Sequence, residues 1–264
     1  ETLQKNIPYH FPGKIMAEIR IIPTLLLHKS GLYKTVNFKN PLYVGEPINA
    51  VRIFNEKEAD ALLLLDYQAS VEGREPDYNK ISEIAGEAFM PMAYGGGIKS
   101  WDIAKKVFDC GYEKVVLNTV LFDDISLIDK IAAVYGSQAV VGSIDVKKDL
   151  LGRNKVYAQS GKKKTGYAPV EWAAKLEQAG VGEIMINSIE RDGTWGGFAL
   201  DLIGEISHKV SVPVIACGGA GSFDDLEKAA KAGASAVAAG SMFVFQKKGM
   251  GVLISFPTGK KIIV

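Results

Sequence analysis

The chain has few of the residue types that build metal centres, disulfide frameworks and nucleophilic triads. Its 264 residues include two cysteines, Cys110 and Cys217, and three histidines. The cysteines fall on a helical pattern and at the end of an apolar strand-like run, so we expect no structural disulfide. No spacing of His, Cys and carboxylates matches a metal-ligand pattern. The sequence therefore indicates neither a metal nor another cofactor, and it disfavours zinc and triad chemistry.

An excess of one charge sign and a long apolar run are also lacking. The 31 basic and 30 acidic residues leave a formal charge of +1, which argues against a broad cationic face for nucleic acid. No apolar run approaches the ~20 residues that span a bilayer. We therefore expect a cytoplasmic protein with neither nucleic acid nor a membrane among its partners. The length fits two ordinary domains or one (β/α)8 barrel.

Short apolar runs alternate with amphipathic stretches along the chain. The strand-like runs are residues 19–27, 61–66, 90–94, 114–118, 139–145, 183–187, 212–217 and 236–239. Helical patterns between them include 77–88, 100–109, 125–135, 169–179, 201–209 and 222–231. Eight β-α units without a linker predict an α/β fold, a single TIM barrel over residues 16–264, with a doubly wound sheet as the alternative. We expect residues 1–15 to be a disordered extension.

Two connections are long for a barrel, residues 28–46 and 147–166. Connections of this length at the C-terminal face are often functional lids, and solvated insertions are the alternative. The second contains Lys155, Val156 and Tyr157 between glycines, which predicts a small hairpin. It also contains the basic run 162–164, for which contact with phosphate and simple solvation both stay open.

The chain contains an internal repeat. Residues 95–119, laid over residues 217–241, give seven identities in 25 positions, so we predict two homologous half-barrels. The identities are Gly96/Gly218, Gly97/Gly219, Ser100/Ser222, Asp102/Asp224, Lys106/Lys228, Gly111/Gly233 and Val115/Val237. Ser100 and Ser222 are predicted helix N-caps.

The repeated glycines follow the third and seventh strand-like runs. Glycine lets a backbone approach a ligand closely, and N–H groups at a helix start favour anions. The loops after strands seven and eight are the usual phosphate site of a TIM barrel, and the repeat places a second site across its mouth. The repeat therefore predicts a ligand with a phosphate at each end, unless the glycines only ease tight turns. The residues assigned to these sites are Gly96, Gly97, Asn118, Thr119, Gly218, Gly219, Gly240 and Ser241.

One carboxylate is expected at the centre of the mouth. The fifth run ends in Asp145, and the half-barrel repeat places Leu26 where a second acid would lie. One carboxylate facing a leucine cannot divide acid and base roles as an opposed pair can. Asp66 ends the second strand-like run and Asp192 follows the sixth, although Asp192, before a glycine, fits an ordinary turn residue.

These motifs together resemble the HisF family, the cyclase subunit of imidazole glycerol phosphate synthase. The resemblance spans residues 17–245 and rests on Ile21-Ile22-Pro23, Leu65-Asp66, Tyr94-Gly95-Gly96-Gly97-Ile98, Asn118-Thr119, Ser143-Ile144-Asp145, Arg191-Asp192-Gly193-Thr194 and Cys217-Gly218-Gly219-Ala220-Gly221. It implies a TIM barrel that takes ammonia from a HisH-type glutaminase at its N-terminal face. The ammonia then reacts with a bisphosphate ribulosyl substrate, PRFAR, which gives imidazole glycerol phosphate and AICAR.

The resemblance also implies residue roles. Asp145 matches one aspartate of the family's catalytic pair, and Leu26 replaces the other. Lys34 matches a conserved lysine of the lid, and Asp66 and Asp192 match substrate-binding positions. The charged ring at the ammonia entrance matches Arg20, Lys114 and Glu183, but its fourth member, a glutamate, is Ala61 here. We therefore expect weak cyclisation and retained ammonia conduction.

Segments 47–58, 23–27 and 252–257 resemble a divergent HisF-like branch from bacterial surface-polysaccharide clusters. That branch accompanies a HisH-like glutaminase and a sugar amidotransferase, so its ammonia is expected to serve sugar amidination. Three hypotheses stay open: ammonia supply to another acceptor, full cyclase activity with Asp66 or Asp192 in place of the missing acid, and a non-catalytic scaffold that activates a glutaminase.

Overall fold

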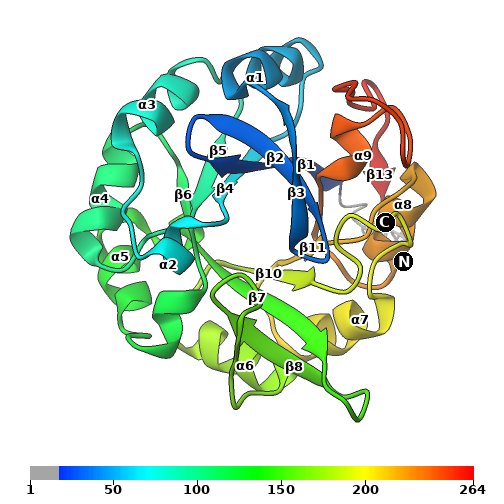
Figure 1. Ribbon diagram of the computed structural model, residues 1–264. Coiled ribbons are helices and arrows are strands. Elements are labelled where there is room, and N and C mark those ends of the chain that lie inside the picture. The colour runs from blue at the N-terminus through cyan, green and yellow to red at the C-terminus, as the bar shows by residue number, and fades with distance from the viewer. Residues whose placement is uncertain (1–17) are drawn as a thin grey trace, which may run out of the picture.

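Eight parallel strands form a closed barrel in the computed structural model, which describes residues 18–264 (Figure 1). The barrel strands are β1 (Glu18–His28), β4 (Leu62–Asp66), β5 (Met92–Gly95), β6 (Lys114–Leu117), β7 (Val140–Lys148), β10 (Glu183–Ser188), β11 (Val214–Cys217) and β12 (Ala236–Ala239). Pairing of β10 with β7 and of β12 with β1 closes the ring. The predicted TIM barrel is confirmed, with all eight strand-like runs in place. The expected extension, residues 1–15, lies outside the described residues.

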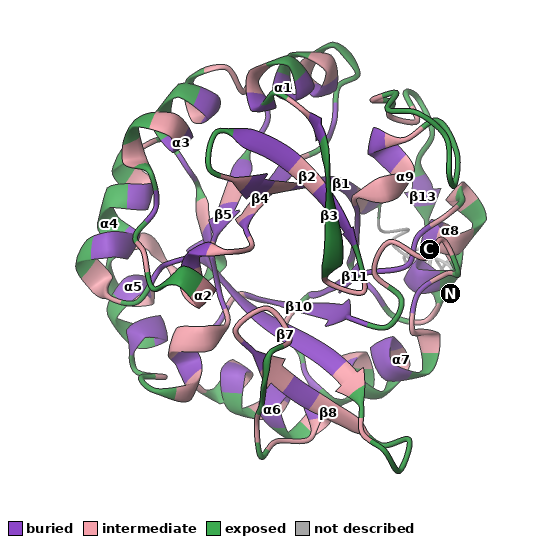
Figure 2. Ribbon diagram, in the orientation of Figure 1, coloured by how far each residue is buried: buried purple, intermediate pink, exposed green. Residues whose placement is uncertain are grey.

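Helices surround the barrel. They are α1 (Pro47–Glu56), α2 (Ala69–Glu72), α3 (Tyr78–Gly86), α4 (Trp101–Asp109), α5 (Leu127–Tyr135), α6 (Pro169–Gln178), α7 (Leu200–Lys209), α8 (Phe223–Lys231) and α9 (Ser241–Val244), with short 3-10 turns η1 (Thr119–Phe122) and η2 (Ser137–Ala139). Their apolar faces turn inward, as the purple bands in Figure 2 show. Among residues 18–264, no helix is long and apolar enough to cross a membrane.

Alternation along β1 explains how the strands separate two apolar layers. Leu25 and Leu27 belong to the large cluster between the strands and the helices, whereas Ile22 belongs to a smaller cluster inside the barrel. Successive side chains of a strand point to opposite faces, so Thr24 and Leu26 share the inner face with Ile22. Position 26 therefore faces the barrel mouth.

The half-barrel repeat is visible in the backbone. Ser100 and Ser222 cap α4 and α8, each accepting a hydrogen bond from the N–H three residues later, and their φ angles are −153° and −148°. Asn118 and Gly240, at the matching ends of the next strands, have φ/ψ values of −133°/−82° and −107°/−75°. Equivalent residues therefore place equivalent loops on opposite sides of the mouth.

Both long connections contain strands. The first folds into a hairpin of β2 (Gly31–Val36) and β3 (Lys39–Gly45), followed by α1, neither of which the sequence patterns predicted. The second carries β8 (Asn154–Ala158), antiparallel to β7, and β9 (Lys163–Lys164), which confirms the predicted small hairpin. β13 (Ile262–Ile263) pairs with the start of β1. Cys110 and Cys217 are free thiols.

Candidate active site

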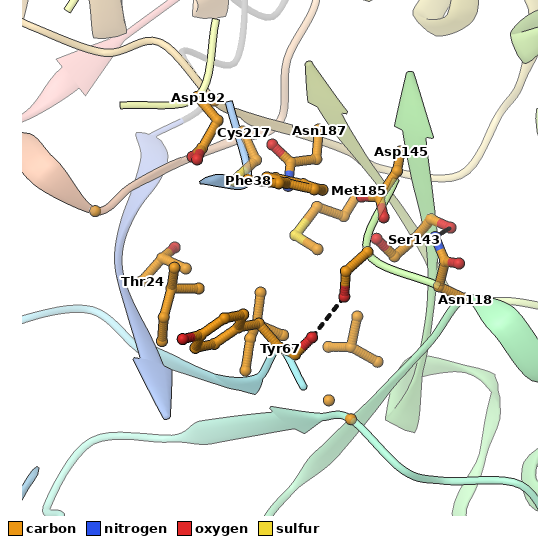
Figure 3. Close-up of a pocket in the computed structure, with 18 of the residues that line it drawn as sticks. Thr24, Phe38, Tyr67, Asn118, Ser143, Asp145, Met185, Asn187, Asp192 and Cys217 are labelled. Carbon is orange, nitrogen blue, oxygen red and sulfur yellow. Dashed lines mark hydrogen bonds between the residues drawn. The ribbon is translucent and has the colours of Figure 1, made fainter. Parts of the chain in front are cut away.

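A cavity of about 140 Å³ opens at the C-terminal ends of the barrel strands (Figure 3). Ser143 and Asp145 of β7 lie on one side, and Thr24 of β1 and Tyr67 after β4 lie on the other. It gathers side chains from both half-barrels because parallel strands all end at this face. The structure brings Leu26, Lys34, Asp66, Gly96, Gly97, Asn118, Thr119, Asp145, Asp192, Gly218, Gly219, Gly240 and Ser241 together in its lining.

Asp145 is a buried carboxylate whose pKa suits it to proton transfer. It is 8% exposed, and burial raises its pKa to about 7, with a smaller contribution in the same direction from Asp192. The side-chain amide of Asn187, its register partner on β10, acts in the opposite direction. A carboxyl group with a pKa near neutrality can both donate and accept a proton at physiological pH.

Leu26 makes the β1 side of the cavity apolar. It lies beside Leu65 of β4 in the parallel register, and both line the cavity. Below it on the same strand face, the buried hydroxyl of Thr24 has no hydrogen-bond partner among the described residues. Asp145 therefore lacks an opposed carboxylate from β1.

Lys34 enters the cavity from the β2–β3 hairpin. It is buried and donates a hydrogen bond to the carbonyl of Thr24, and its ammonium lies against Gly240. Burial lowers its pKa to about 8, while the nearby Asp192 opposes this shift. Burial also raises the pKa of Asp192, whose carboxylate accepts a hydrogen bond from Thr35 Oγ1 at 3.0 Å. Asp192 is thus part of the pocket as well as a turn residue.

The β2–β3 hairpin is folded over the loop that follows β10. Asn37 donates its backbone N–H to the carbonyl of Asp192 at 2.9 Å. Its side-chain amide donates to the carbonyls of Ile189 and Glu190 at 3.1 and 2.7 Å. These bonds bring Phe38 to the cavity rim, so the first long connection has the position expected of a lid.

The repeated glycines are required by the backbone. Gly97 has φ +70°, and a Cβ there would lie 2.6 Å from the carbonyl oxygen of Arg74. Gly219 has φ +116°, and a Cβ there would overlap the carbonyl of Gly197. Glycine is therefore required for both tight turns, and both residues line the cavity, whereas phosphate binding at these loops stays a prediction.

The ends of β6 and β12 complete two similar concave loops. Asn118 Nδ2 donates to the carbonyl of Ser143 at 3.1 Å, which fixes the loop that starts η1. The Thr119 hydroxyl accepts a hydrogen bond from Gln159 N–H at 3.0 Å and donates a long one to Asn118 Oδ1 at 3.5 Å. Gly240 and Ser241 occupy the matching place at the start of α9.

Asp66 lines the cavity, but its carboxylate is already fully engaged. Arg74 donates to both oxygens at 2.6 and 2.7 Å, and Ala69 N–H donates at 3.1 Å. A bidentate, buried pair of this kind holds a loop in place. The geometry therefore does not favour Asp66 as a substitute for the acid missing at position 26.

A second cavity, about 200 Å³, opens at the opposite end of the barrel. Glu183 Oε1 accepts both Arg20 Nη2 at 2.6 Å and Lys114 Nζ at 3.0 Å, and these three residues lie together at its rim. Ala61 brings no charge to this cluster, although its neighbour Asp60 also lines the cavity and accepts a hydrogen bond from Ile21 N–H at 2.8 Å. Met185 and Val116 line both cavities, so this layer separates the two ends of the barrel interior.

Sequence patterns missed Asn187 and Arg74. Asn187 is the polar residue at the C-terminal end of a barrel strand, a position that often carries function. Its side-chain oxygen is buried and has no hydrogen-bond partner among the described residues. Arg74 lies in a loop, where no local pattern predicts its pairing with Asp66.

Comparison with known proteins identifies the family. The model of the histidine biosynthesis protein family matches residues 20–248. The imidazole glycerol phosphate synthase subunit named hisF2 of Pseudomonas aeruginosa is 54% identical over 250 residues, which cover 94% of this chain and all of the relative. The chain belongs to the HisF family.

Other members show the same full-length likeness. The subunit named HisF from Leptospira interrogans is 43% identical, over 92% of this chain and 96% of its own length. Imidazole glycerol phosphate synthase subunit HisF of Chlorobium luteolum is 42% identical, over 86% of this chain and 91% of its own length. This family is the cyclase subunit of imidazole glycerol phosphate synthase, a lyase.

Proposed function

We propose that this HisF-type subunit takes ammonia from a HisH-type glutaminase at its N-terminal face and delivers it at its C-terminal face, where a phosphorylated ligand binds. The two cavities at opposite ends of one barrel support this proposal, since Met185 and Val116 line both of them. The matched loops at Gly97 and Gly219 support a ligand with an anionic group at each end.

We further propose that cyclisation of PRFAR is impaired and that the ammonia serves another acceptor, in sugar amidination for a surface polysaccharide. The observation that carries this proposal is Leu26, which leaves Asp145 without an opposed acid. Loss of a general acid or base removes about 10²–10⁴-fold in rate. The engaged carboxylate of Asp66 offers no replacement.

The second candidate is the full cyclase, which converts PRFAR and ammonia to imidazole glycerol phosphate and AICAR in histidine biosynthesis. The names of the relatives favour it, and so does the presence of both glycine loops. Asp192, buried in the same cavity and with a raised pKa, is the acid that could assist Asp145.

Turnover of PRFAR with an ammonium salt by the isolated protein separates the two candidates. We expect a rate at least 10²-fold below that of a HisF protein with both aspartates. Formation of imidazole glycerol phosphate at a comparable rate would refute the impaired-cyclase proposal and establish the second candidate. Activation of a bound glutaminase without transfer of nitrogen to any acceptor would instead indicate the scaffold role.

A further inference from the structure

The β7–β8 hairpin projects beyond the ring of helices and ends in two exposed leucines (Figure 1). The side chains of Leu150 and Leu151 are 105% and 74% exposed, and the tip is green in Figure 2. Isolated exposed leucines are common, but two adjacent ones at a protruding turn form a small apolar knob.

The turn holds these leucines outward by a dense set of hydrogen bonds. The Asp149 carboxylate accepts from Leu151 N–H at 2.9 Å, from Arg153 N–H at 3.0 Å and from Arg153 Nε at 3.0 Å. Backbone bonds join Asp149 to Arg153 and to Gly152, each at 2.9 Å. These bonds hold the pKa of Asp149 below its usual range. The knob is therefore preorganised for contact.

The surface around the knob is cationic. Residues 147–164 carry six lysines, one arginine and one acid, Asp149, whose carboxylate is taken up by Arg153. Lys147 and Lys155 lie directly opposite each other in the β7–β8 register. Like charges directly opposite each other destabilise a sheet. Within residues 18–264 none of the six lysines forms an ion pair, so their charges face outward uncompensated.

This surface continues to the mouth of the cavity. Ser160, which lines the cavity, donates a hydrogen bond to the carbonyl of Tyr67, and the lysines 162–164 follow in the next turn and β9. The hairpin therefore flanks the mouth of the cavity.

We propose that the hairpin surface, residues 147–164, docks a partner protein with an acidic, concave face, and that this partner consumes the ammonia delivered at the mouth. The proposal rests on the proposed ammonia-supplying function. The lysines of the hairpin require an acidic surface on the partner for charge complementarity. The protruding leucine tip requires a concave apolar site in that surface. The glutaminase is expected at the opposite end of the barrel, so both proteins can bind together.

Site-specific photo-crosslinking in the native host tests the proposal. A benzoylphenylalanine at position 151 keeps the tip apolar, and the same probe at Phe89, 90% exposed and just before β5 at the opposite face, is the matched control. We expect position 151 to capture a protein other than the glutaminase, through a peptide rich in Asp and Glu. Leu150→Ser should lower the crosslinking yield roughly tenfold, because the complex loses the burial of one leucine side chain.

Charge reversal supplies the second criterion. The double variant Lys147→Glu/Lys155→Glu inverts the charge of the hairpin surface. It keeps a like-charge pair across the two strands, so the repulsion within the hairpin matches that of the parent. It should lower the yield at position 151 at least tenfold, whereas Lys247→Glu/Lys248→Glu, at exposed residues elsewhere, should not. Absence of a product at position 151, or a yield insensitive to Leu150→Ser and to the reversal, would overturn the proposal. If the parent protein sediments with phosphatidylglycerol vesicles and these variants do not, the hairpin surface binds a lipid bilayer, and the proposal of a protein partner is overturned.

Nitrogen transfer distinguishes this proposal from the proposed function. The captured protein is incubated with the complete complex and glutamine labelled with ¹⁵N in the side-chain amide. Label in the product of the captured protein supports both proposals. Charge-dependent capture without label transfer refutes the ammonia-consuming role and the proposed acceptor pathway, while the docking surface stands.

Discussion

Replacement of Asp145 by asparagine should make the protein more stable at alkaline pH. The folded protein holds this carboxyl in a site where burial raises its pKa to about 7, from an ordinary value of 3.8. The folded state therefore binds the proton more tightly than the unfolded state does. Below pH 3.8 both states are protonated and the group has no effect, and above pH 7 the cost of the buried charge is fully present.

The magnitude follows from the shift. About three pKa units at 1.36 kcal/mol each give a cost of roughly 4 kcal/mol at pH 8 and roughly 1 kcal/mol at pH 4.5. Asparagine has nearly the same shape and no charge, so Asp145→Asn should remove this cost. The free energy of unfolding of the variant should exceed that of the parent by about 3 kcal/mol more at pH 8 than at pH 4.5.

Urea unfolding followed by circular dichroism at both pH values measures the difference. Asp109→Asn, at a half-exposed carboxylate that pairs with Lys105 on α4, is the control for the loss of a carboxyl group in general. A stability gap between parent and Asp145→Asn that is the same at pH 4.5 and pH 8 would refute the assignment of a buried, destabilised carboxylate. A buried carboxyl group with such a cost is typical of functional sites, which agrees with the prediction that Asp145 is catalytic.

Three further results are expected. Leu26→Asp should raise any residual PRFAR cyclisation by about 10²-fold or more, measured with an ammonium salt, because it restores an acid opposite Asp145; an unchanged rate would show that another difference limits cyclisation. Gly219→Ala should lower the melting temperature and abolish stabilisation by inorganic phosphate, because the residue has φ +116° and its Cβ would overlap a carbonyl; a retained phosphate effect would contradict this. Arg74→Leu should cost about 3 kcal/mol in urea unfolding by leaving the buried Asp66 unpaired; a loss below about 1 kcal/mol would show that this pair does not stabilise the loop.

The barrel and much of the site follow from local patterns. Short apolar runs bounded by turn residues predicted the eight strands, and the sequence repeat aligned Gly97 with Gly219. Leu26 was found in the same way, because a repeat shows which residue should match Asp145. These signals are readable because the strand pattern depends on residues near one another in the chain, and the repeat on a comparison of two short segments.

Other features depend on contacts that local patterns do not specify. The hairpin at residues 31–45 was predicted only as a long loop, because its closing contacts lie more than 150 residues away, from Asn37 to Ile189 and Glu190. The state of Asp66 was equally hidden, because Arg74 reaches it from an irregular loop. Such pairings depend on how loops pack together and leave no periodic trace in the sequence.

The sequence by itself determined that this chain forms a barrel of two related halves, with glycine loops on both sides and a leucine at position 26. Strand periodicity and turn chemistry are local properties, so composition and order specify them. Only the tertiary structure decided which polar groups are available. Parallel register sets Asn187 beside Asp145, Arg74 occupies Asp66, and burial shifts the pKa of Asp145 and Lys34 toward neutrality. Desolvation and pairing arise when distant segments pack, and they decide what each side chain can do.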